Sequence, residues 1–411
     1  MRKSKFVRIA SKLLLIIIGI VFACGLAEFG ARLLGPPYGL DKDIFRIHQC
    51  DQTLGWRGVA QGALMLDWHG YEHPFVLNSQ GMHDNEHTWE KDDDVFRILM
   101  IGDSMLAATE VAEAETSHQI LENILNQKSD DMRFEVINGA IFAWGPPQAL
   151  MYFRTEGKNY NPDLVLVSWF PGNDLSDVLP YHVMTMGPEG GVHCFAPYFA
   201  LCDEQFDPRP WFVAPGISQD WQKCTPQRRM ITRTLNYIYY HSRLYQRLTA
   251  GLLQVYEKET FSLNLYSPWL DFTQEDTRLN EAYQLTIGIY GQLANEADKI
   301  GAKTAFFISP VNEAIDVDVN PDRRAAMIAR EPILDQADPT LPNKTFITMM
   351  TEQNIPVVDL HPYFVAHIQS TGESLHWSAN NSHWNIAGNR VAGETLATWL
   401  IEQKLVPIEN N

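Results

Sequence analysis

The sequence predicts an α/β protein built on a parallel sheet. Short runs rich in Val, Ile, Leu and Phe recur along the chain, and segments with helical periodicity separate most of them. This alternation is typical of a parallel sheet that helices cover on both faces. The five candidate strands are residues 96–101, 134–138, 164–169, 303–308 and 356–359. A chain of 411 residues with ordinary apolar and charged fractions is long enough for one large domain with additions.

The first element is an apolar helix behind a basic start. Residues 1–12 carry basic but no acidic side chains, and residues 13–27 are uncharged and apolar. We expect a signal anchor over residues 13–34, with Glu28 and Arg32 at its far interface. A cleavable signal peptide is the alternative. The basic flank predicts a cytoplasmic N-terminus, with the bulk of the chain on the other side of the membrane.

Residues 35–94 read as a linker and an irregular extension that is rich in histidine. Two pairs, His69 with His73 and His83 with His87, have the spacing of two metal ligands on a helix. Nearby Gly and Pro residues disfavour a helix through either pair. We therefore expect surface or loop histidines and no metal.

The strand at 96–101 ends at Gly102-Asp103-Ser104, so it delivers a serine at a strand-to-helix turn. In an open α/β sheet this position faces the cleft at the carboxyl ends of the strands. A serine hydroxyl there is a candidate nucleophile if a base lies beside it. Alone, Gly-Asp-Ser more often forms a simple turn.

Three later blocks supply partners for this serine, in chain order. The strand at 134–138 ends in Asn138-Gly139, and the strand at 164–169 runs into a loop that carries Asn173. Near the C-terminus, His383 precedes a helix whose apolar face predicts burial against the sheet. The combination places an amide donor and a general base where the serine needs them.

In this arrangement the chain resembles the SGNH (GDSL-like) hydrolase superfamily, and its membrane-attached bacterial branch in particular, over residues 77–400. The resemblance implies a flavodoxin-like three-layer α/β/α sandwich with a five-stranded parallel sheet, preceded by the transmembrane helix and interrupted by an insertion. It implies that Ser104 is the nucleophile and His383 the general base. It also implies an oxyanion hole formed by Ser104, Ala143 and Asn173.

Two positions depart from the family pattern. Ala143 stands where the family has a glycine, and an alanine is strained there if the position needs a positive φ, so Gly145 is an alternative donor. Asn380 and Asn381 occupy the place of the aspartate that usually precedes the histidine. Three possibilities remain open: a Ser-His dyad with Asn381 or Asn380 or a backbone carbonyl as orienter, a carboxylate from elsewhere such as Asp359 or Glu373, or a degenerate site.

Residues 175–280 interrupt the core and are rich in aromatic side chains. Trp211, Trp221 and Trp269 are candidates for stacking on sugar rings, with a small subdomain core as the alternative. Cysteine usage fits export, because four cysteines follow the hydrophobic segment and suffice for two disulfides. We expect Cys194 and Cys202 to pair; four buried thiols are the alternative.

The net charge of −18 disfavours nucleic acid and anionic surfaces as partners. The domains expected are a cytoplasmic tail at 1–12, the anchor at 13–34, the extension at 35–94 and a hydrolase-like domain at 95–411. The predicted function is that of a serine esterase without metal or organic cofactor, attached to the bacterial inner membrane and facing the periplasm. Its substrates would be acyl esters, acetyl among them, of a glycan or lipid-like molecule. An envelope polysaccharide O-acyltransferase and a catalytically silent glycan-binding or assembly protein are the alternatives.

Overall fold

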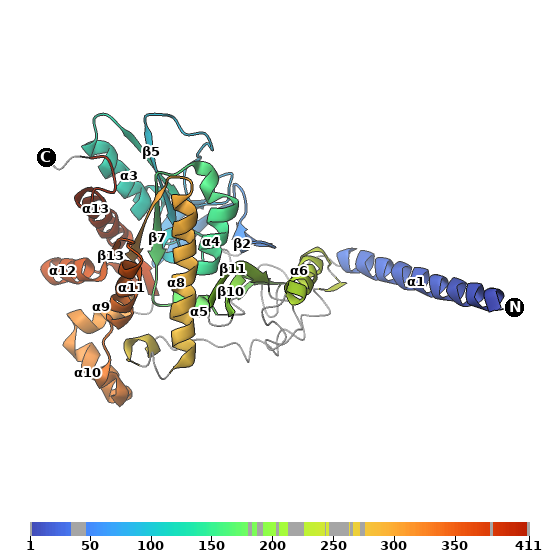
Figure 1. Ribbon diagram of the computed structural model, residues 1–411. Coiled ribbons are helices and arrows are strands. Elements are labelled where there is room, and N and C mark those ends of the chain that lie inside the picture. The colour runs from blue at the N-terminus through green and yellow to red at the C-terminus, as the bar shows by residue number, and fades with distance from the viewer. Residues whose placement is uncertain are drawn as a thin grey trace.

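A five-stranded parallel sheet forms the centre of the computed structural model (Figure 1). Its strand order is β13-β12-β7-β5-β6, which is the flavodoxin-like order. The strands are β5 (Val95–Ile101), β6 (Arg133–Asn138), β7 (Leu164–Trp169), β12 (Lys303–Ile308) and β13 (Val357–Asp359). All five predicted strands are confirmed, two of them to the residue. The structure describes residues 2–33, 47–179, 183–186, 192–202, 205–212, 226–242, 244–245, 263, 266–271, 276–378 and 381–408.

Side chains alternate along the strands between two separate hydrophobic cores. On β5, Leu99 and Ile101 enter one core, whereas Ile98 and Met100 enter the other. Helices α4 (Pro146–Thr155), α8 (Thr277–Asp298) and α11 (Leu341–Glu352) cover the first face. The second face packs against α3 (Ser117–Lys128), α9 (Asn312–Val319), α12 (His361–Thr371) and α13 (Ile386–Glu402). The chain is therefore a three-layer α/β/α sandwich, as predicted.

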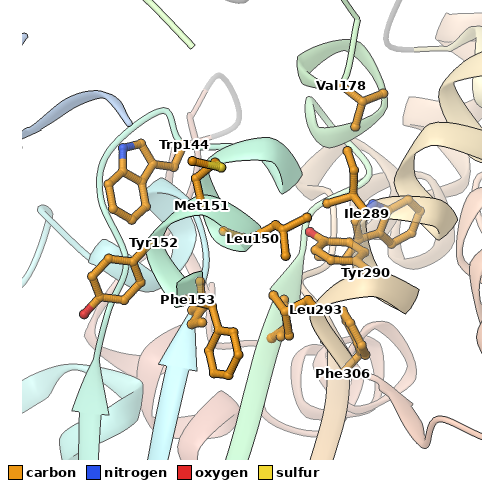
Figure 2. Packing of buried hydrophobic residues seen from close by; sticks show 14 of the residues in the cluster. Trp144, Leu150, Met151, Tyr152, Phe153, Val178, Ile289, Tyr290, Leu293 and Phe306 are labelled. Carbon is orange, nitrogen blue, oxygen red and sulfur yellow. The ribbon is translucent and has the colours of Figure 1, made fainter. Parts of the chain in front are cut away.

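Aromatic and aliphatic side chains interlock between α4, α8 and the sheet. Figure 2 shows Leu150 and Phe153 of α4 facing Ile289 and Leu293 of α8, with Phe306 of β12 below them. All five are fully buried. Burying a side chain of this size contributes about 1.5–3 kcal/mol to folding. This packing fixes the strand ends that carry the candidate site.

The N-terminal helix α1 (Arg2–Leu33) extends away from the body (Figure 1). Residues Ala10–Leu33 are long and apolar enough to cross a membrane, and none of the most apolar window is buried inside the protein. Exposed Leu, Ile and Phe side chains cover this helix. The predicted apolar helix is thus present, and it is compatible with a membrane anchor or a signal sequence.

The extension is more regular than expected. It contains two antiparallel hairpins, formed by β1 (His48–Asp51) with β2 (Gly55–Gly58) and by β3 (Ala63–Trp68) with β4 (Tyr71–Val76). Gly70, at φ +89°, allows the tight turn between β3 and β4. These strands are only four to six residues long, and exposure alternates along β3 and β4 while β2 is mostly buried.

The insertion contributes two more hairpins and a helix. The hairpins are β8 (Val183–Met186) with β9 (Val192–Phe195) and β10 (Pro197–Cys202) with β11 (Gln205–Phe212), followed by α6 (Pro226–His241). Trp269 is 2% exposed and belongs to the core, so its proposed contact with sugar is wrong. Trp211 lies in β11, whereas Trp221 lies outside the described residues.

A disulfide joins the insertion to the extension. Cys194 of β9 is bonded to Cys50 of β1, so the predicted pairing of Cys194 with Cys202 is wrong. Cys202 is itself disulfide-bonded, and Cys224 lies outside the described residues. The partners are 144 positions apart, so sequence proximity, which favoured Cys202, misled the prediction. The bond ties the extension, which precedes the central sheet in sequence, to the insertion, which interrupts the sheet between β7 and β12.

Candidate active site

Ser104 stands at the carboxyl end of β5, as the first residue of the short helix α2 (Ser104–Ala107). Asp103 caps this helix by accepting a hydrogen bond from the Met105 N–H at 3.0 Å. Gly102 precedes it because a Cβ there would lie 2.8 Å from the Ser168 Cβ on β7. The turn thus depends on the Gly-Asp-Ser order that the sequence presents.

His383 lies on β15 (Asn381–Trp384), directly before α13, and it points at the serine. Its Nε2 is 2.9 Å from the Ser104 Oγ. β15 pairs with β14 (His376–Ser378), and the Asn385 side chain caps α13 by accepting from the Gly388 N–H. The Phe142 ring packs against the imidazole at 6.3 Å between centroids. Two segments far apart in sequence therefore bring a hydroxyl and an imidazole into hydrogen-bond contact.

A carboxylate from a third segment lies behind the histidine. The Glu110 Oε1 is 3.3 Å from the His383 Nδ1, and Glu110 is 1% exposed. No hydrogen-bond partner of this oxygen is found among the described residues. Burial raises the pKa of Glu110, and the charge of His383 opposes the rise. Ser104, His383 and Glu110 thus form the chain of contacts that a serine nucleophile, its base and an orienting carboxylate require.

Sequence reasoning missed Glu110, and the other carboxylates it considered lie elsewhere. Asp359 accepts hydrogen bonds from the Asn343 side chain and the His361 N–H. Glu373 is exposed and pairs with His367 and Arg390. Asn381 belongs to β15, and Asn380 lies outside the described residues.

The only signal for Glu110 in the sequence was its place six residues after Ser104. The left-handed Ala108, at φ +49°, ends α2 and turns the chain so that Glu110 returns toward the site. An alanine in that conformation is not recognisable from sequence, because glycine and asparagine are the usual residues there.

The proposed donor Ala143 adopts φ +60°, the left-handed conformation in which an alanine is strained and a glycine is not. The alternative donor, Gly145, is not available. Its N–H donates to the Gln148 side chain at 3.1 Å, and a Cβ there would meet the Asp177 Cβ at 2.6 Å. Gly145 thus serves the start of α4 rather than the site.

Asn173 stands at the end of β7, immediately before the short helix α5 (Asp174–Asp177). Its Nδ2 donates to the Asp177 Oδ2 at 2.8 Å, which fixes the orientation of the amide. A hydrogen bond from the same side chain is among the contacts that lower the pKa of Asp103. Asn173 therefore lies beside the residue that precedes Ser104.

Three buried carboxyl groups surround Asn173. Burial raises the pKa of Asp103 to about 6, although the Met105 N–H and the charge of His383 oppose the rise. Burial, with the charge of Asp103, raises the pKa values of Asp174 and Asp177 well above the usual range. These groups hold protons at pH values where an exposed aspartate is ionised.

Two buried histidines of the extension support the segment between Ser104 and Glu110. The His83 Nδ1 contacts the Ala107 carbonyl at 2.9 Å, and the His73 Nε2 contacts the Thr109 carbonyl at 3.1 Å. Both side chains are 1% exposed. The expectation of surface or loop histidines is wrong for His73, which is buried in β4, whereas His83 lies in a loop as expected but is buried there. Burial lowers the pKa of His83 to about 4, so the ring is neutral near pH 7.

One group of side chains outside this site has the composition of a metal site. Ligand atoms of Asp84, Glu113 and His118 lie within 4.8 Å of one another. The Asp84 carboxylate already accepts from the Asn138 N–H at 2.7 Å and contacts His118 and His87, each at 3.1 Å. Burial alone would raise the pKa of Asp84, but His118 and His87 hold it well below its usual range. We assign these residues a structural role, because they tie the extension to α3 and β6.

Comparisons with known proteins return likenesses in structure only. No family model and no curated protein match the sequence. Among solved structures, the acetyl xylan esterase AlAXEase is 13% identical, with a TM-score of 0.36 over 74% of this chain and 100% of that one. An acetyl-xylooligosaccharide esterase from Geobacillus stearmophilus is 12% identical, with a TM-score of 0.39 over 77% and 97%. The esterase EstA from Pseudoalteromonas is 12% identical, with a TM-score of 0.35 over 76% and 100%.

Proposed function

We propose that the protein is a serine esterase that cleaves acyl esters through an acyl-serine intermediate. The observation that carries this proposal is the chain of contacts from the Ser104 Oγ to the His383 Nε2, at 2.9 Å, and from the His383 Nδ1 to the Glu110 Oε1, at 3.3 Å. A serine hydroxyl becomes an effective nucleophile when such a base takes its proton. In this proposal Glu110 takes the place of the aspartate that is missing from the sequence just before His383.

Each residue has a defined task in this proposal. The Ser104 Oγ attacks the ester carbonyl while the His383 Nε2 accepts its proton, and His383 then returns that proton to the departing alcohol. Glu110 orients the imidazole and stabilises its positive charge in the transition state. Water, activated in turn by His383, hydrolyses the acyl-serine and regenerates the enzyme.

Three donors would hold the developing oxyanion: the backbone N–H groups of Ser104 and Ala143 and an Nδ2–H of Asn173. One Nδ2–H of Asn173 donates to Asp177, and the same side chain also hydrogen-bonds Asp103. In this proposal the second N–H turns from Asp103 to the oxyanion when the substrate is bound. Each preorganised donor supplies on the order of 3 kcal/mol of transition-state stabilisation.

We further propose that the enzyme is anchored by α1 and acts outside the cytoplasm on esters of a glycan or lipid-like substrate. The apolar window of Ala10–Leu33, the basic residues before it and the disulfide of Cys50 with Cys194 support this placement. Glu28 and Arg32, near the end of α1, are bonded to the protein body, which favours an uncleaved anchor over a signal peptide. The structural neighbours named as acetyl xylan and acetyl-xylooligosaccharide esterases are the reason to test acetyl esters of polysaccharides first.

The experiment is hydrolysis of p-nitrophenyl acetate by the full-length protein in detergent. We expect turnover that falls by roughly 10³-fold or more in Ser104→Ala, because the nucleophile is lost. Ser370→Ala, which changes an exposed serine on α12, is the matched control and should retain full activity. A fluorophosphonate probe should label the wild type at Ser104 and leave Ser104→Ala unlabelled.

Two outcomes would contradict the esterase proposal. If folded wild type neither turns over the ester nor reacts with the fluorophosphonate, Ser104 is not an activated nucleophile and a silent binding protein is the better description. If the probe labels Ser104 but hydrolysis is absent, the acyl group passes to an acceptor other than water, and the O-acyltransferase alternative replaces the hydrolase.

A further inference from the structure

Helix α6 has one buried face and one exposed apolar face. Thr232, Asn236 and Tyr239 are buried against the body, and the Asn236 Nδ2 contacts the Gln52 carbonyl. The opposite face exposes a stripe of large apolar side chains: Met230, Ile231, Tyr237 and Ile238. Met230 is 66% exposed and Tyr237 55%, which is unusual for side chains of this size. Tyr237 stacks on His241 of the same helix, and the stripe as a whole stays exposed in the described part of the chain.

The C-terminal end of α6 is bonded to the end of the apolar helix α1. The Arg32 Nη2 donates to the His241 carbonyl at 2.9 Å, and Glu28 accepts from the Ser242 hydroxyl at 2.8 Å and from the Leu244 N–H at 3.0 Å. Arg32 and Glu28 also pair with each other at 2.8 Å. Figure 1 shows α6 beside the point where α1 meets the body. The exposed stripe therefore starts where the membrane-length helix ends.

The charge of α6 contrasts with that of the whole protein. The helix contains Arg228, Arg229 and Arg233 but no aspartate or glutamate, in a chain with a net charge of −18. Apolar side chains with tyrosine on one surface, together with arginines, are the composition of helices that lie in a membrane interface. A second protein would account for the apolar stripe, but it would not account for the bonds to α1.

We propose that the exposed face of α6 lies in the interface of the membrane that α1 crosses, and that Glu28 and Arg32 hold it there. This inference rests on the proposed membrane anchoring by α1. With about 1.5 Å of rise per residue, the 16-residue helix spans about 24 Å of that surface. Two contacts of different kinds, a crossing helix and a surface helix, then fix the orientation of the body instead of leaving it to pivot about α1.

The test measures the depth of single labelled positions in vesicles of phosphatidylcholine and phosphatidylglycerol. Cys24 is the free cysteine among the described residues, so Cys24→Ser in the full-length chain gives a background for labelling. A bimane probe is attached at Ile238→Cys on α6. The matched control is Tyr363→Cys on α12, which has a similar exposure in the structure. A third label at Leu15→Cys reports whether α1 is in the bilayer.

We expect quenching by doxyl lipids to be at least about threefold stronger at position 238 than at position 363, with the order reversed for aqueous iodide. Equal quenching at both positions, with position 15 in lipid, overturns the placement of α6 while the anchor stands. Absence of lipid quenching at position 15 overturns the anchor and the inference together. Activity of the labelled proteins toward p-nitrophenyl acetate is scored separately, so failure of the esterase proposal is distinguishable.

The bonds to α1 are tested with the same label. Glu28→Ala removes the acceptor for Ser242 and Leu244, so we expect lipid quenching at position 238 to fall toward the value at position 363. Glu28→Gln keeps an acceptor oxygen and should restore most of the quenching. If Glu28→Ala leaves the depth of position 238 unchanged, Glu28 does not hold α6 at the membrane.

Discussion

At the scale of single residues, the central question is how the protein supports a histidine without an aspartate before it in the chain. Asn381 cannot stabilise an imidazolium as a carboxylate does. Glu110 is buried at 1% exposure and lies 3.3 Å from the His383 Nδ1. Burial removes water that would screen this contact, so a charge there acts more strongly than a surface carboxylate. The position of the carboxylate in sequence matters less than its position behind the ring.

Replacement of Glu110 tests this interpretation. In Glu110→Gln we expect kcat for p-nitrophenyl acetate to fall by about 10²–10⁴-fold, because the amide no longer stabilises the imidazolium and favours the wrong tautomer. KM should change little, since Glu110 lies behind His383 and not on the nucleophile side. The measurement is steady-state kinetics over a range of pH, which separates loss of the base from loss of folding.

Glu113→Gln is the matched control, because Glu113 lies in the same segment and pairs with Asn85 instead of the histidine. It should retain activity within a few-fold of wild type. An active Glu110→Gln variant with an unchanged pH profile would mean that His383 works as a dyad with Ser104, and that Glu110 has only a packing role.

At the scale of elements, the loop between β6 and α4 carries the strain of the candidate site. Ala143 has φ +60°, which costs about 1–2 kcal/mol for a residue with a Cβ. The following residues are fixed: Trp144 is fully buried and donates to the Trp56 carbonyl, and Gly145 begins α4. The loop therefore holds Ala143 in an unfavourable conformation through the packing of its neighbours.

We expect Ala143→Gly to raise the free energy of unfolding by about 1 kcal/mol, because glycine adopts positive φ without steric cost. Activity should be retained, since the backbone N–H stays in place. Ala140→Gly is the matched control: Ala140 is buried in the same loop without a positive φ, so glycine there should destabilise. Chemical denaturation of the wild type and the two variants in detergent measures whether Ala143→Gly raises and Ala140→Gly lowers the free energy of unfolding. Equal destabilisation by the two glycines would show that the left-handed conformation of Ala143 carries no strain.

The same scale shows what the sequence can and cannot predict. The strands were predicted because residues such as Val165 and Val167 form continuous apolar runs that only a buried strand explains. The blocks that carry Ser104 and His383 were recognisable because both sit at ends of elements with clear hydrophobic patterns. Glu110 was not recognisable, because a single carboxylate in a loop is not part of any hydrophobic pattern. Its proposed role depends on a contact with His383, which lies far along the chain.

At the scale of the whole molecule, the extension and the insertion are joined to the core by contacts that local sequence patterns cannot reveal. The disulfide of Cys50 with Cys194 spans 144 positions. His83 lies in a loop, as expected, but the sequence did not show that it is buried against the Ala107 carbonyl. Pairings of this kind depend on the tertiary fold, so they were the places where prediction failed.

Buried histidines are expected to make the folded protein less stable at acidic pH. Burial lowers the pKa of His83 to about 4 and that of His376 to about 3, compared with about 6.5 in an unfolded chain. As pH falls below 6.5, His83 and His376 bind protons in the unfolded state but stay neutral in the folded state. The free energy of unfolding therefore decreases as the pH is lowered from about 6.5. Above pH 7 both histidines are neutral in the folded and in the unfolded state, so they no longer contribute to its pH dependence.

The buried carboxyl groups beside Asn173 are expected to make the folded protein less stable at alkaline pH. Burial and the charge of Asp103 raise the pKa values of Asp174 and Asp177 well above the unfolded value of about 4, so the folded state binds more protons than the unfolded state above pH 4. Each of these groups therefore lowers the free energy of unfolding as pH rises from about 4 toward its raised pKa, by about 1.4 kcal/mol per pH unit. We expect the decline to be seen most clearly above pH 7, where the histidines no longer contribute.

Asp177→Asn should flatten this decline, because asparagine keeps an acceptor for the Asn173 Nδ2 but cannot ionise. Asp93→Asn, at an exposed position, should leave the decline as it is in wild type. The measurement is the denaturation midpoint of the full-length protein at pH 7, 8 and 9 in one detergent. A wild-type stability that is constant or rises over this interval would mean that the buried carboxyl groups are already ionised at pH 7. The environment of Asn173 would then be anionic, which is unfavourable for an oxyanion held at the same amide.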